Sequence, residues 1–222
     1  MQAERDAAAY RYDPPPGPPV ILHADASLVV VEKPAGLLSV PGKGAEKADC
    51  MIARLLARYP RVLLVHRLDG DTSGVMVFAR TSAAQVALSG QFERRETVKH
   101  YVARVAGHVA GEAGTVDLPL AVDWPNRPRQ HVDHESGRPA LTEWQVIARG
   151  DGETRLRLVP RTGRTHQLRV HMAALGHPIL GDALYASGVA AGHPRLMLHA
   201  EELGFRHPGT GAPVTFVARC PF

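Results

Sequence analysis

The chain has 222 residues, of which 45% are hydrophobic and 22% are charged, as in an ordinary globular protein with one substantial domain. No apolar run approaches the ~20 residues of a membrane-spanning helix, and the N-terminus lacks the pattern of a secretory signal, so we expect a cytoplasmic protein. The net charge of +4 supports nucleic-acid binding only weakly, although 22 of the 26 basic residues are Arg, a good donor to phosphates and base edges.

The first predicted elements are a tail, a strand and a helix. Residues 1–19 end in a Pro/Gly cluster and are predicted to form an N-terminal tail or an extended strap ahead of one catalytic domain over 20–222. The β-branched segment 21–32 predicts one strand, and 50–60 places apolar side chains on one face of a helix.

Two buried strands are expected next, over 62–66 and 74–80, with a tight polar loop between them. Thr81 or Ser82 is expected to cap a helix that ends at Glu93.

The rest of the chain is rich in strand patterns. Residues 97–107 alternate as a strand that displays Tyr101, whereas 123–133 has two prolines and no periodicity and predicts an exposed loop. The later elements are antiparallel strands over 141–149 and 153–160, a helix over 166–176, and short strands within 195–200 and 213–218. Many antiparallel strands with few helices predict an α+β fold centred on a long, mainly antiparallel sheet.

Ionisable residues gather in the loop HRLDGDTSG at 66–74. Loops held by rigid strands are favoured sites of catalysis. Asp69 and Asp71 could form a paired-carboxylate acid/base site, and Ser73 could be misread as a nucleophile although the G-x-S-x-G spacing is absent. On this loop alone, an Asx-turn that only closes a hairpin remains the alternative.

A second polar segment, RTGRTHQLR at 161–169, lies at a predicted strand-to-helix junction. From residue 154 to 181 the chain carries five Arg, three His and no acidic residue, which suggests a surface for a polyanion. If the two polar segments meet, Arg164 could pair with Asp69 and keep that carboxylate ionised. The side chains that could hold phosphates are Arg161, Arg164, His166 and Arg169.

Metal and nucleotide cofactors are not indicated. Cys50 and Cys220 form no CxxC pair. The histidine pairs at 166/171 and 131/134 have no carboxylate at the spacing of a recognised metal site, and the Gly-rich phosphate-binding patterns are absent. We therefore expect no metal and no cofactor.

The motif HRLDGDTSGVMVFAR at 66–80 resembles the catalytic motif of the RluA-type pseudouridine synthases. Three further segments resemble that family in its order and usual spacing: VVVEKPAGLLSVPG at 29–42, KHYVARVAG at 99–107 and RTGRTHQLRVHMAALGHPILGDALYA at 161–186. The resemblance implies the catalytic domain of the family, with a central cleft. Larger members carry an N-terminal S4 domain, which we do not expect here because about twenty residues precede the first matching segment.

The resemblance implies that Asp69 is the nucleophile, Tyr101 the active-site tyrosine and Arg164 the basic partner of the nucleophile. Arg67 corresponds to the arginine that helps to hold the target nucleotide out of its helix, and Leu168 to an apolar residue near the base. The remaining candidates for RNA contacts are Arg127, Arg129, Arg161, His166 and Arg169. The implied reaction is the isomerisation of uridine in RNA, which needs no redox change.

The loop DWPNRPRQ at 123–130 resembles a short member of the family that modifies both 23S rRNA and the anticodon arm of some tRNAs, so these RNAs are the expected partners of a monomeric enzyme. Two alternatives stay open. One is a catalytically silent RNA-binding module. The other is a glycosidase that uses Asp69 and Asp71, although residues two apart in one loop cannot easily flank a sugar.

Overall fold

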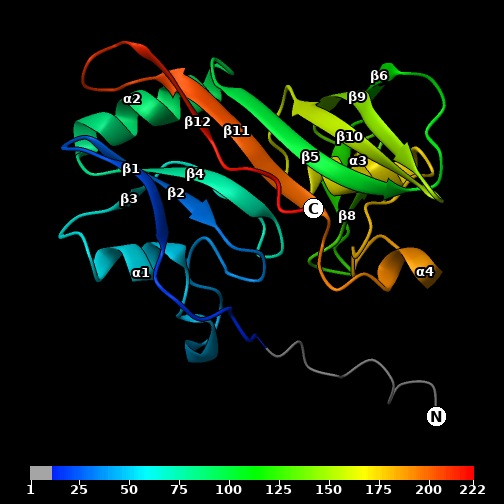
Figure 1. Ribbon diagram of the computed structural model, residues 1–222, viewed down its shortest axis with the longest axis horizontal. Helices are drawn as coiled ribbons and strands as arrows, with labels where there is room; N and C mark the ends of the chain where they lie inside the picture. The colour runs from blue at the N-terminus through cyan, green and yellow to red at the C-terminus, as the bar shows by residue number, and fades with distance from the viewer. Residues whose placement is uncertain (1–11) are drawn as a thin grey trace.

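A computed structural model describes residues 12–222 of the chain, so residues 1–11 of the expected tail lie outside the described residues. A ten-stranded sheet has the spatial order β1-β2-β4-β11-β5-β10-β9-β6, with β12 paired to β11 and β3 paired to β4 (Figure 1). Its strands are β1 (Val20–Ala24), β2 (Leu28–Lys33), β3 (Leu63–Leu64), β4 (Ser73–Ala79), β5 (Val98–Ala106), β6 (Ala113–Asp117), β9 (Leu141–Gly150), β10 (Glu153–Pro160), β11 (Leu198–Arg206) and β12 (Pro213–Val217). A separate two-stranded sheet pairs β7 (Leu120–Val122) with β8 (Gln130–Val132).

The helices are few and short. They are the 3-10 turn η1 (Ala45–Lys47) and the α-helices α1 (Met51–Leu56), α2 (Ser82–Glu93), α3 (Gln167–Ala174) and α4 (Gly188–Ala191). Strand pairs are antiparallel except β4 with β11. The predicted α+β class with a long, mainly antiparallel sheet is therefore confirmed. Within residues 12–222, no helix is long and apolar enough to cross a membrane.

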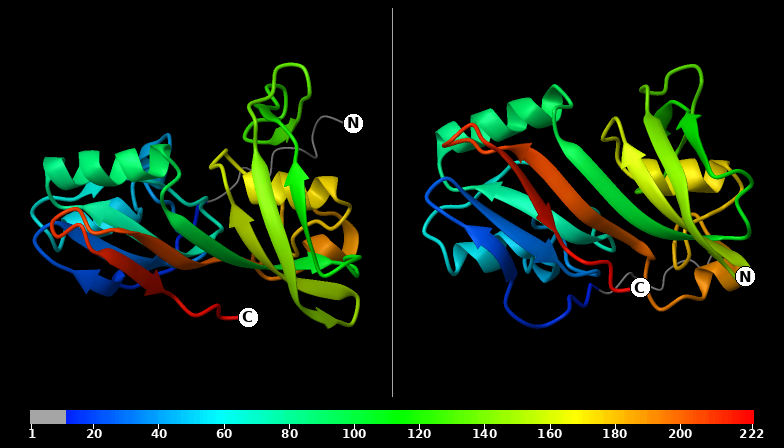
Figure 2. Two further views of the ribbon diagram at one scale, coloured as in Figure 1. Left: turned by 90° about the horizontal axis from the view of Figure 1, so that it is seen from above. Right: turned by 45° about the horizontal axis from the view of Figure 1, so that its top comes forward.

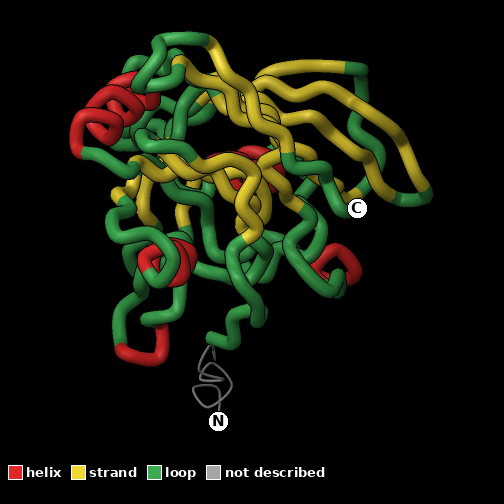
Figure 3. The backbone as a smooth tube through the Cα atoms, turned by 60° about the vertical axis from the view of Figure 1, so that its left-hand side comes forward, coloured by secondary structure: helices red, strands yellow, loops and turns green. Residues whose placement is uncertain are grey.

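The first half of the sheet is covered on both faces. On β2, Leu28 and Val30 belong to the core cluster of α2, while Val29 and Val31 pack with Met51 and other residues around α1. Alternate side chains of one strand thus meet different helices, which lie on opposite sides of the strands (Figure 3). Burial on both faces explains why β2 and β4 are almost continuously apolar in sequence.

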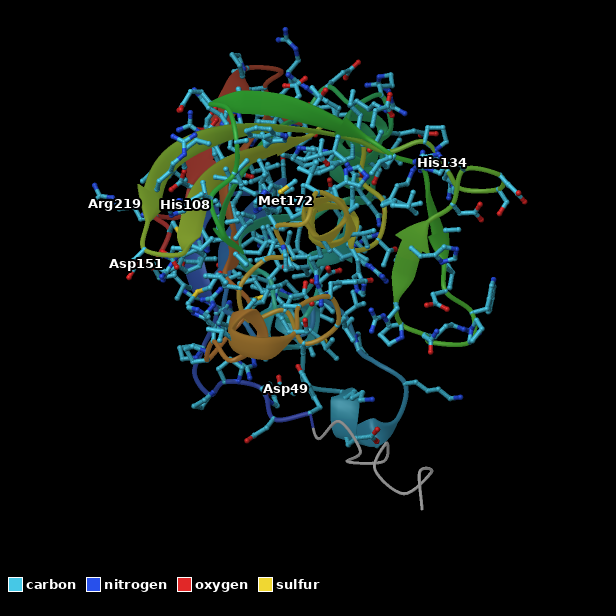
Figure 4. All side chains as sticks on the ribbon, turned by 90° about the vertical axis from the view of Figure 1, so that its right-hand side faces the viewer. Asp49, His108, His134, Asp151, Met172 and Arg219 are labelled. Atoms are coloured by element: carbon cyan, nitrogen blue, oxygen red, sulfur yellow. The ribbon has the colours of Figure 1, made fainter. Side chains whose placement is uncertain are left out.

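The second half packs α3 against the sheet. Leu168 and Met172 of α3 share a buried cluster with Leu156 and Leu158 of β10. Met172 lies beside its helix and beneath the strands of this half (Figure 4). The strands of the two halves run in different directions, so the sheet is strongly twisted (Figure 2).

The central strands β4, β11 and β5 join the halves. The parallel pairing brings Ser73 and Gly74 of β4 beside His199 and Ala200 of β11. Gly74 has a φ of 118°, and a Cβ there would lie 2.1 Å from the carbonyl oxygen of Ala200. Only glycine allows this close approach, which fixes the strand that follows the polar loop 66–72.

Several sequence predictions need correction. The single strand expected over 21–32 is a hairpin, because the Asp25 carboxylate accepts hydrogen bonds from the main-chain N–H groups of Ser27 (2.6 Å) and Leu28 (3.0 Å) and so closes a turn. The strand expected over 62–66 is only the two residues of β3, and the loop expected over 123–133 contains β8. The helix α2 capped by Thr81, the strand β5, the β9–β10 pair and α3 are confirmed.

Residues 12–19, the part of the expected tail that the structure describes, lie against the domain. Tyr12 is 9% exposed, and its hydroxyl donates to the carbonyl oxygen of Asp49 (2.8 Å) and accepts from the N–H of Leu38 (3.0 Å). Arg54 of α1 donates to the carbonyl oxygens of Pro15 and Gly17. This segment is therefore a strap bound to the first half rather than a free tail.

Candidate active site

A cleft of about 600 Å³ opens between the loop 66–72, β5 and the segment that leads into α3. Most of the candidates singled out in the sequence line this one cleft, namely Arg67, Asp69, Tyr101, Arg161, Arg164, His166, Leu168 and Arg169. The fold thus brings together two polar segments that are almost a hundred residues apart in the chain.

The loop that carries Asp69 is held in place by hydrogen bonds to its main chain. Ser39 donates its hydroxyl to the carbonyl oxygen of Leu68 (2.7 Å) and accepts from the N–H of the same residue (3.1 Å). The N–H of Gly36 donates to the carbonyl oxygen of Gly70 (2.9 Å). A carboxylate on a loop held at both of its neighbours has a fixed position, as a nucleophile requires.

Lys33 is a fully buried lysine beneath this loop. Its Nζ donates to three main-chain carbonyls, those of Pro34, Leu37 and Gly70, at 2.6–2.9 Å. Burial lowers the pKa of Lys33 to about 7, although the nearby carboxylates of Asp71 and Asp69 oppose that shift. Nothing in the sequence marks this residue, because a lysine at the end of a strand pattern has the appearance of a solvated one.

The carboxylate of Asp69 faces Arg169, and the prediction that it pairs with Arg164 is wrong. Nη1 of Arg169 lies 3.6 Å from Oδ2 of Asp69, and Nε2 of His166 lies 3.9 Å from the same oxygen. Arg169 is on the buried face of α3 and is 3% exposed. Arg164 comes before the helix starts, lines the cleft further out, and donates its Nε to the carbonyl oxygen of Pro139 (3.1 Å).

Asp182 orients Arg169. It is fully buried, and its two oxygens accept from Nε and Nη2 of Arg169, both at 2.7 Å. This bidentate pair uses one side of the guanidinium and leaves Nη1 directed at Asp69. Burial alone would lower the pKa of Arg169, but Asp182 and then Asp69 raise it, so the cation persists in the cleft.

Tyr101 lies on β5 where the two halves of the sheet meet, and it packs against the core clusters of both. Burial raises the pKa of its hydroxyl, and the charge of Asp69 raises it further. The phenol is therefore neutral at physiological pH. Leu168 also lines the cleft, is 6% exposed, and offers it an apolar surface.

The other basic candidates differ in whether their side chains are already paired with a carboxylate. Arg67 is exposed at the cleft. Arg161 forms a bidentate pair with Glu143, with both N–O distances 2.7 Å, so it must leave that partner to contact a phosphate. Arg95 and Lys99 also line the cleft, and sequence analysis missed them because they flank the start of a strand outside either polar segment.

Arg127 and Arg129 lie outside this cleft, on the hairpin formed by β7 and β8. A second hollow of about 640 Å³ is lined partly by that hairpin and shares Gly163 and Arg164 with the cleft. Trp124 in the hairpin is 68% exposed, and the guanidinium carbon of Arg127 lies 4.0 Å from its ring centroid. A flat exposed indole beside a cation is suited to unpaired nucleic-acid bases.

Comparisons with known proteins agree with this geometry. A family model described as RNA pseudouridylate synthase matches residues 27–174. The dual-specificity RNA pseudouridine synthase RluA of Escherichia coli (strain K12) is 54% identical over 214 residues, covering 95% of this chain and 98% of that protein. The protein of the same name from Yersinia pestis is 52% identical over 205 residues, covering 91% and 100%. The solved structure of human RNA Pseudouridylate Synthase Domain Containing 1 gives a TM-score of 0.77 at 29% identity, covering 94% of this chain and 87% of that chain.

Proposed function

This chain belongs to the RNA pseudouridylate synthase family and isomerises uridine to pseudouridine in RNA, and we propose that Asp69 is the nucleophile. The observation that carries the proposal is the placement of the Asp69 carboxylate in a cleft, 3.6 Å from the Arg169 guanidinium. An adjacent fixed cation keeps a carboxylate ionised and oriented.

The reaction breaks the bond between uracil N1 and ribose C1′, turns the base, and joins C5 to C1′. C5 then loses its proton, and N1 gains one. Asp69 provides the nucleophile for the first step, and Arg169 holds its charge in place. Tyr101 lies beside the base and assists the final proton loss, while Leu168 supplies an apolar wall for the turning ring. The atoms of substrate and product are the same, so no co-reactant is consumed.

A stacked uridine cannot enter the cleft, so the enzyme must flip it out, at a cost of a few kcal/mol. Phosphate contacts offset that cost. We assign them to Arg67, which helps to hold the extruded nucleotide at the cleft, and to Arg164, Arg161, Arg127 and Arg129 around it. Of these, Arg161 changes partners from Glu143 to phosphate.

The substrates proposed are 23S rRNA and the anticodon arm of tRNA. Two relatives that this chain matches over more than nine-tenths of its length carry the description dual-specificity RNA pseudouridine synthase. The hairpin with Trp124 gives the surface beside the cleft an element that can contact unpaired bases in either RNA.

The test compares Asp69→Ala with Asp71→Ala, a change of the neighbouring carboxylate in the same loop. Each variant is incubated with 23S rRNA and tRNA transcripts, and pseudouridine is read by carbodiimide-adduct primer extension. Asp69→Ala is expected to bind RNA and form no pseudouridine, because only the nucleophile is lost, whereas Asp71→Ala keeps activity. Conversion by Asp69→Ala would overturn the nucleophile assignment, and release of free uracil by the wild type would indicate a hydrolase.

A further inference from the structure

Tyr185 connects the β7–β8 hairpin with the cleft. Its hydroxyl lies 2.8 Å from the main-chain N of Gln130 in β8 and 2.7 Å from Nδ1 of His166. Its ring lies near two cations, with the guanidinium carbons of Arg169 and Arg129 at 5.2 Å and 5.4 Å from the ring centroid. The residue therefore touches the hairpin and both basic partners of Asp69.

The donors and acceptors around the Tyr185 hydroxyl favour one tautomer of His166. The main-chain N–H of Gln130 can only donate, so the tyrosine oxygen accepts there, and the single hydroxyl proton is left for Nδ1 of His166. A neutral His166 then carries its proton on Nε2, the atom that faces Oδ2 of Asp69 at 3.9 Å. Burial lowers the pKa of His166, although Asp69 opposes the shift, so the neutral ring is favoured.

The backbone of His166 supports a specific role for this side chain. The residue has φ 54° and ψ 16°, in the left-handed region, at the position immediately before α3. Residues other than glycine rarely adopt this conformation, and where they do, the surrounding structure must hold them. Its side chain is 9% exposed, and the contact with Tyr185 holds it within the cleft.

A second link ties Tyr185 to Arg169 through Asp182. Oδ1 of Asp182 accepts from the main-chain N–H groups of Leu184 (2.9 Å) and Tyr185 (3.1 Å). The same oxygen accepts from Nη2 of Arg169. One buried carboxylate thus fixes the main chain of Tyr185 and the guanidinium that faces Asp69.

We propose that Tyr185 is a positioning residue for the isomerisation, whose hydroxyl holds His166 with its Nε2–H directed at Asp69 and ties that arrangement to the docked β7–β8 hairpin. The proposal rests on the role of Asp69 proposed above. His166 acts here through the orientation of the carboxylate, and Tyr185 acts through His166.

The main test is Tyr185→Phe, which keeps the ring and its contacts with the two arginines and removes the hydroxyl. Single-turnover rates at saturating enzyme are expected to fall roughly 10- to 100-fold, because the nucleophile is less well oriented, while the Kd for RNA stays within about twofold. Tyr59→Phe, which alters a tyrosine beside Arg80, is the matched control and should leave both quantities unchanged.

The tautomer of His166 is a measurement that would not change if Tyr185 had a purely structural role. Imidazole ¹⁵N shifts of the wild-type enzyme should show His166 protonated at Nε2 and not at Nδ1, with the signal assigned by its loss in His166→Gln. In Tyr185→Phe the Nε2–H fraction should fall. The double variant with His166→Gln and Tyr185→Phe should react no more slowly than His166→Gln alone, because Tyr185 acts through His166.

A Tyr185→Phe rate equal to that of Tyr59→Phe, or a wild-type His166 protonated at Nδ1, would overturn the proposal. If Tyr185→Phe does not fold, the wild-type tautomer and the rate of His166→Gln decide the question, and a wild-type rate in His166→Gln also counts against it. If the assignment of Asp69 as nucleophile is itself wrong, the result is different, because Asp69→Ala would then form pseudouridine whatever the tautomer of His166.

Discussion

Asp69 has two basic neighbours from one short segment, and Arg169 is more deeply buried than His166. The guanidinium of Arg169 is divided between Asp182 and Asp69. A lysine ammonium is a single point charge and cannot make a bidentate pair with one carboxylate while it faces another. The planar shape of the arginine, and not only its charge, is therefore required at this position.

This requirement predicts a large difference between two conservative changes. Arg169→Lys is expected to lower the single-turnover rate by at least about 100-fold, because Asp69 loses its fixed partner. Arg164→Lys should keep the rate within a few-fold and weaken RNA binding modestly, because Arg164 lies further out and its side chain donates to the Pro139 carbonyl instead of to Asp69. The opposite ranking in the same assay would restore Arg164 as the partner of the nucleophile.

Sequence patterns singled out Asp69 but not the arginine that it faces, and the reason is local geometry. Asp69 lies in a polar loop between two apolar segments, which is visible in the sequence. Arg164 and Arg169 lie in the same polar segment, and the sequence pattern alone does not show which of the two reaches Asp69. The helix begins at Gln167, so Arg164 precedes it, whereas Arg169 lies within it and is buried.

At the scale of elements, the β7–β8 hairpin is the surface most suited to recognising RNA next to the cleft. Stacking of an unpaired base on an aromatic side chain contributes about 1–3 kcal/mol. We therefore expect Trp124→Ala to raise the Kd for RNA roughly 5- to 100-fold, with little change in the single-turnover rate at saturating enzyme. Val86→Ala, at a 73% exposed site on α2, should change neither quantity. A wild-type Kd in Trp124→Ala would exclude the indole as an RNA contact.

Elements with strong local signals were predicted, and those set by distant contacts were not. The helix α2 has a capping Thr81 and the β9–β10 pair has a short connection, so each is specified within its own segment. The parallel pairing of β4 with β11 joins residues more than a hundred positions apart and depends on Gly74. No periodicity in either strand reports such a contact.

At the scale of the whole molecule, Asp25 joins opposite ends of the described chain. Its Oδ2 lies 2.9 Å from Nε2 of His23 in β1 and 2.8 Å from Nε2 of His207 in the β11–β12 turn. These three residues also have the spacing of a metal site. However, Nδ1 of His207 accepts from the N–H groups of Gly209 and Thr210, so its Nε2 carries the proton and donates to Asp25 instead of binding a cation.

This contact predicts an acid-sensitive contribution to stability. Burial alone would raise the pKa of Asp25, but hydrogen bonds from His23, His207 and two main-chain N–H groups lower it well below its usual range. A lowered pKa in the folded state means that the stabilisation is complete above the unfolded value, near pH 4, and is lost as the pH falls further. Asp25→Asn should therefore lower the free energy of unfolding by about 1–3 kcal/mol at pH 7.

The difference between wild type and Asp25→Asn should then shrink steadily below about pH 4, because the wild-type carboxylate becomes protonated while the amide does not titrate. Urea unfolding at a series of pH values from 7 to 2.5 measures both curves. Asp151→Asn, at the exposed β9–β10 turn (Figure 4), is the matched control and should follow the wild type throughout. A difference for Asp25→Asn that stays constant down to the lowest pH would show that packing, and not the charge of Asp25, holds the two hairpins together.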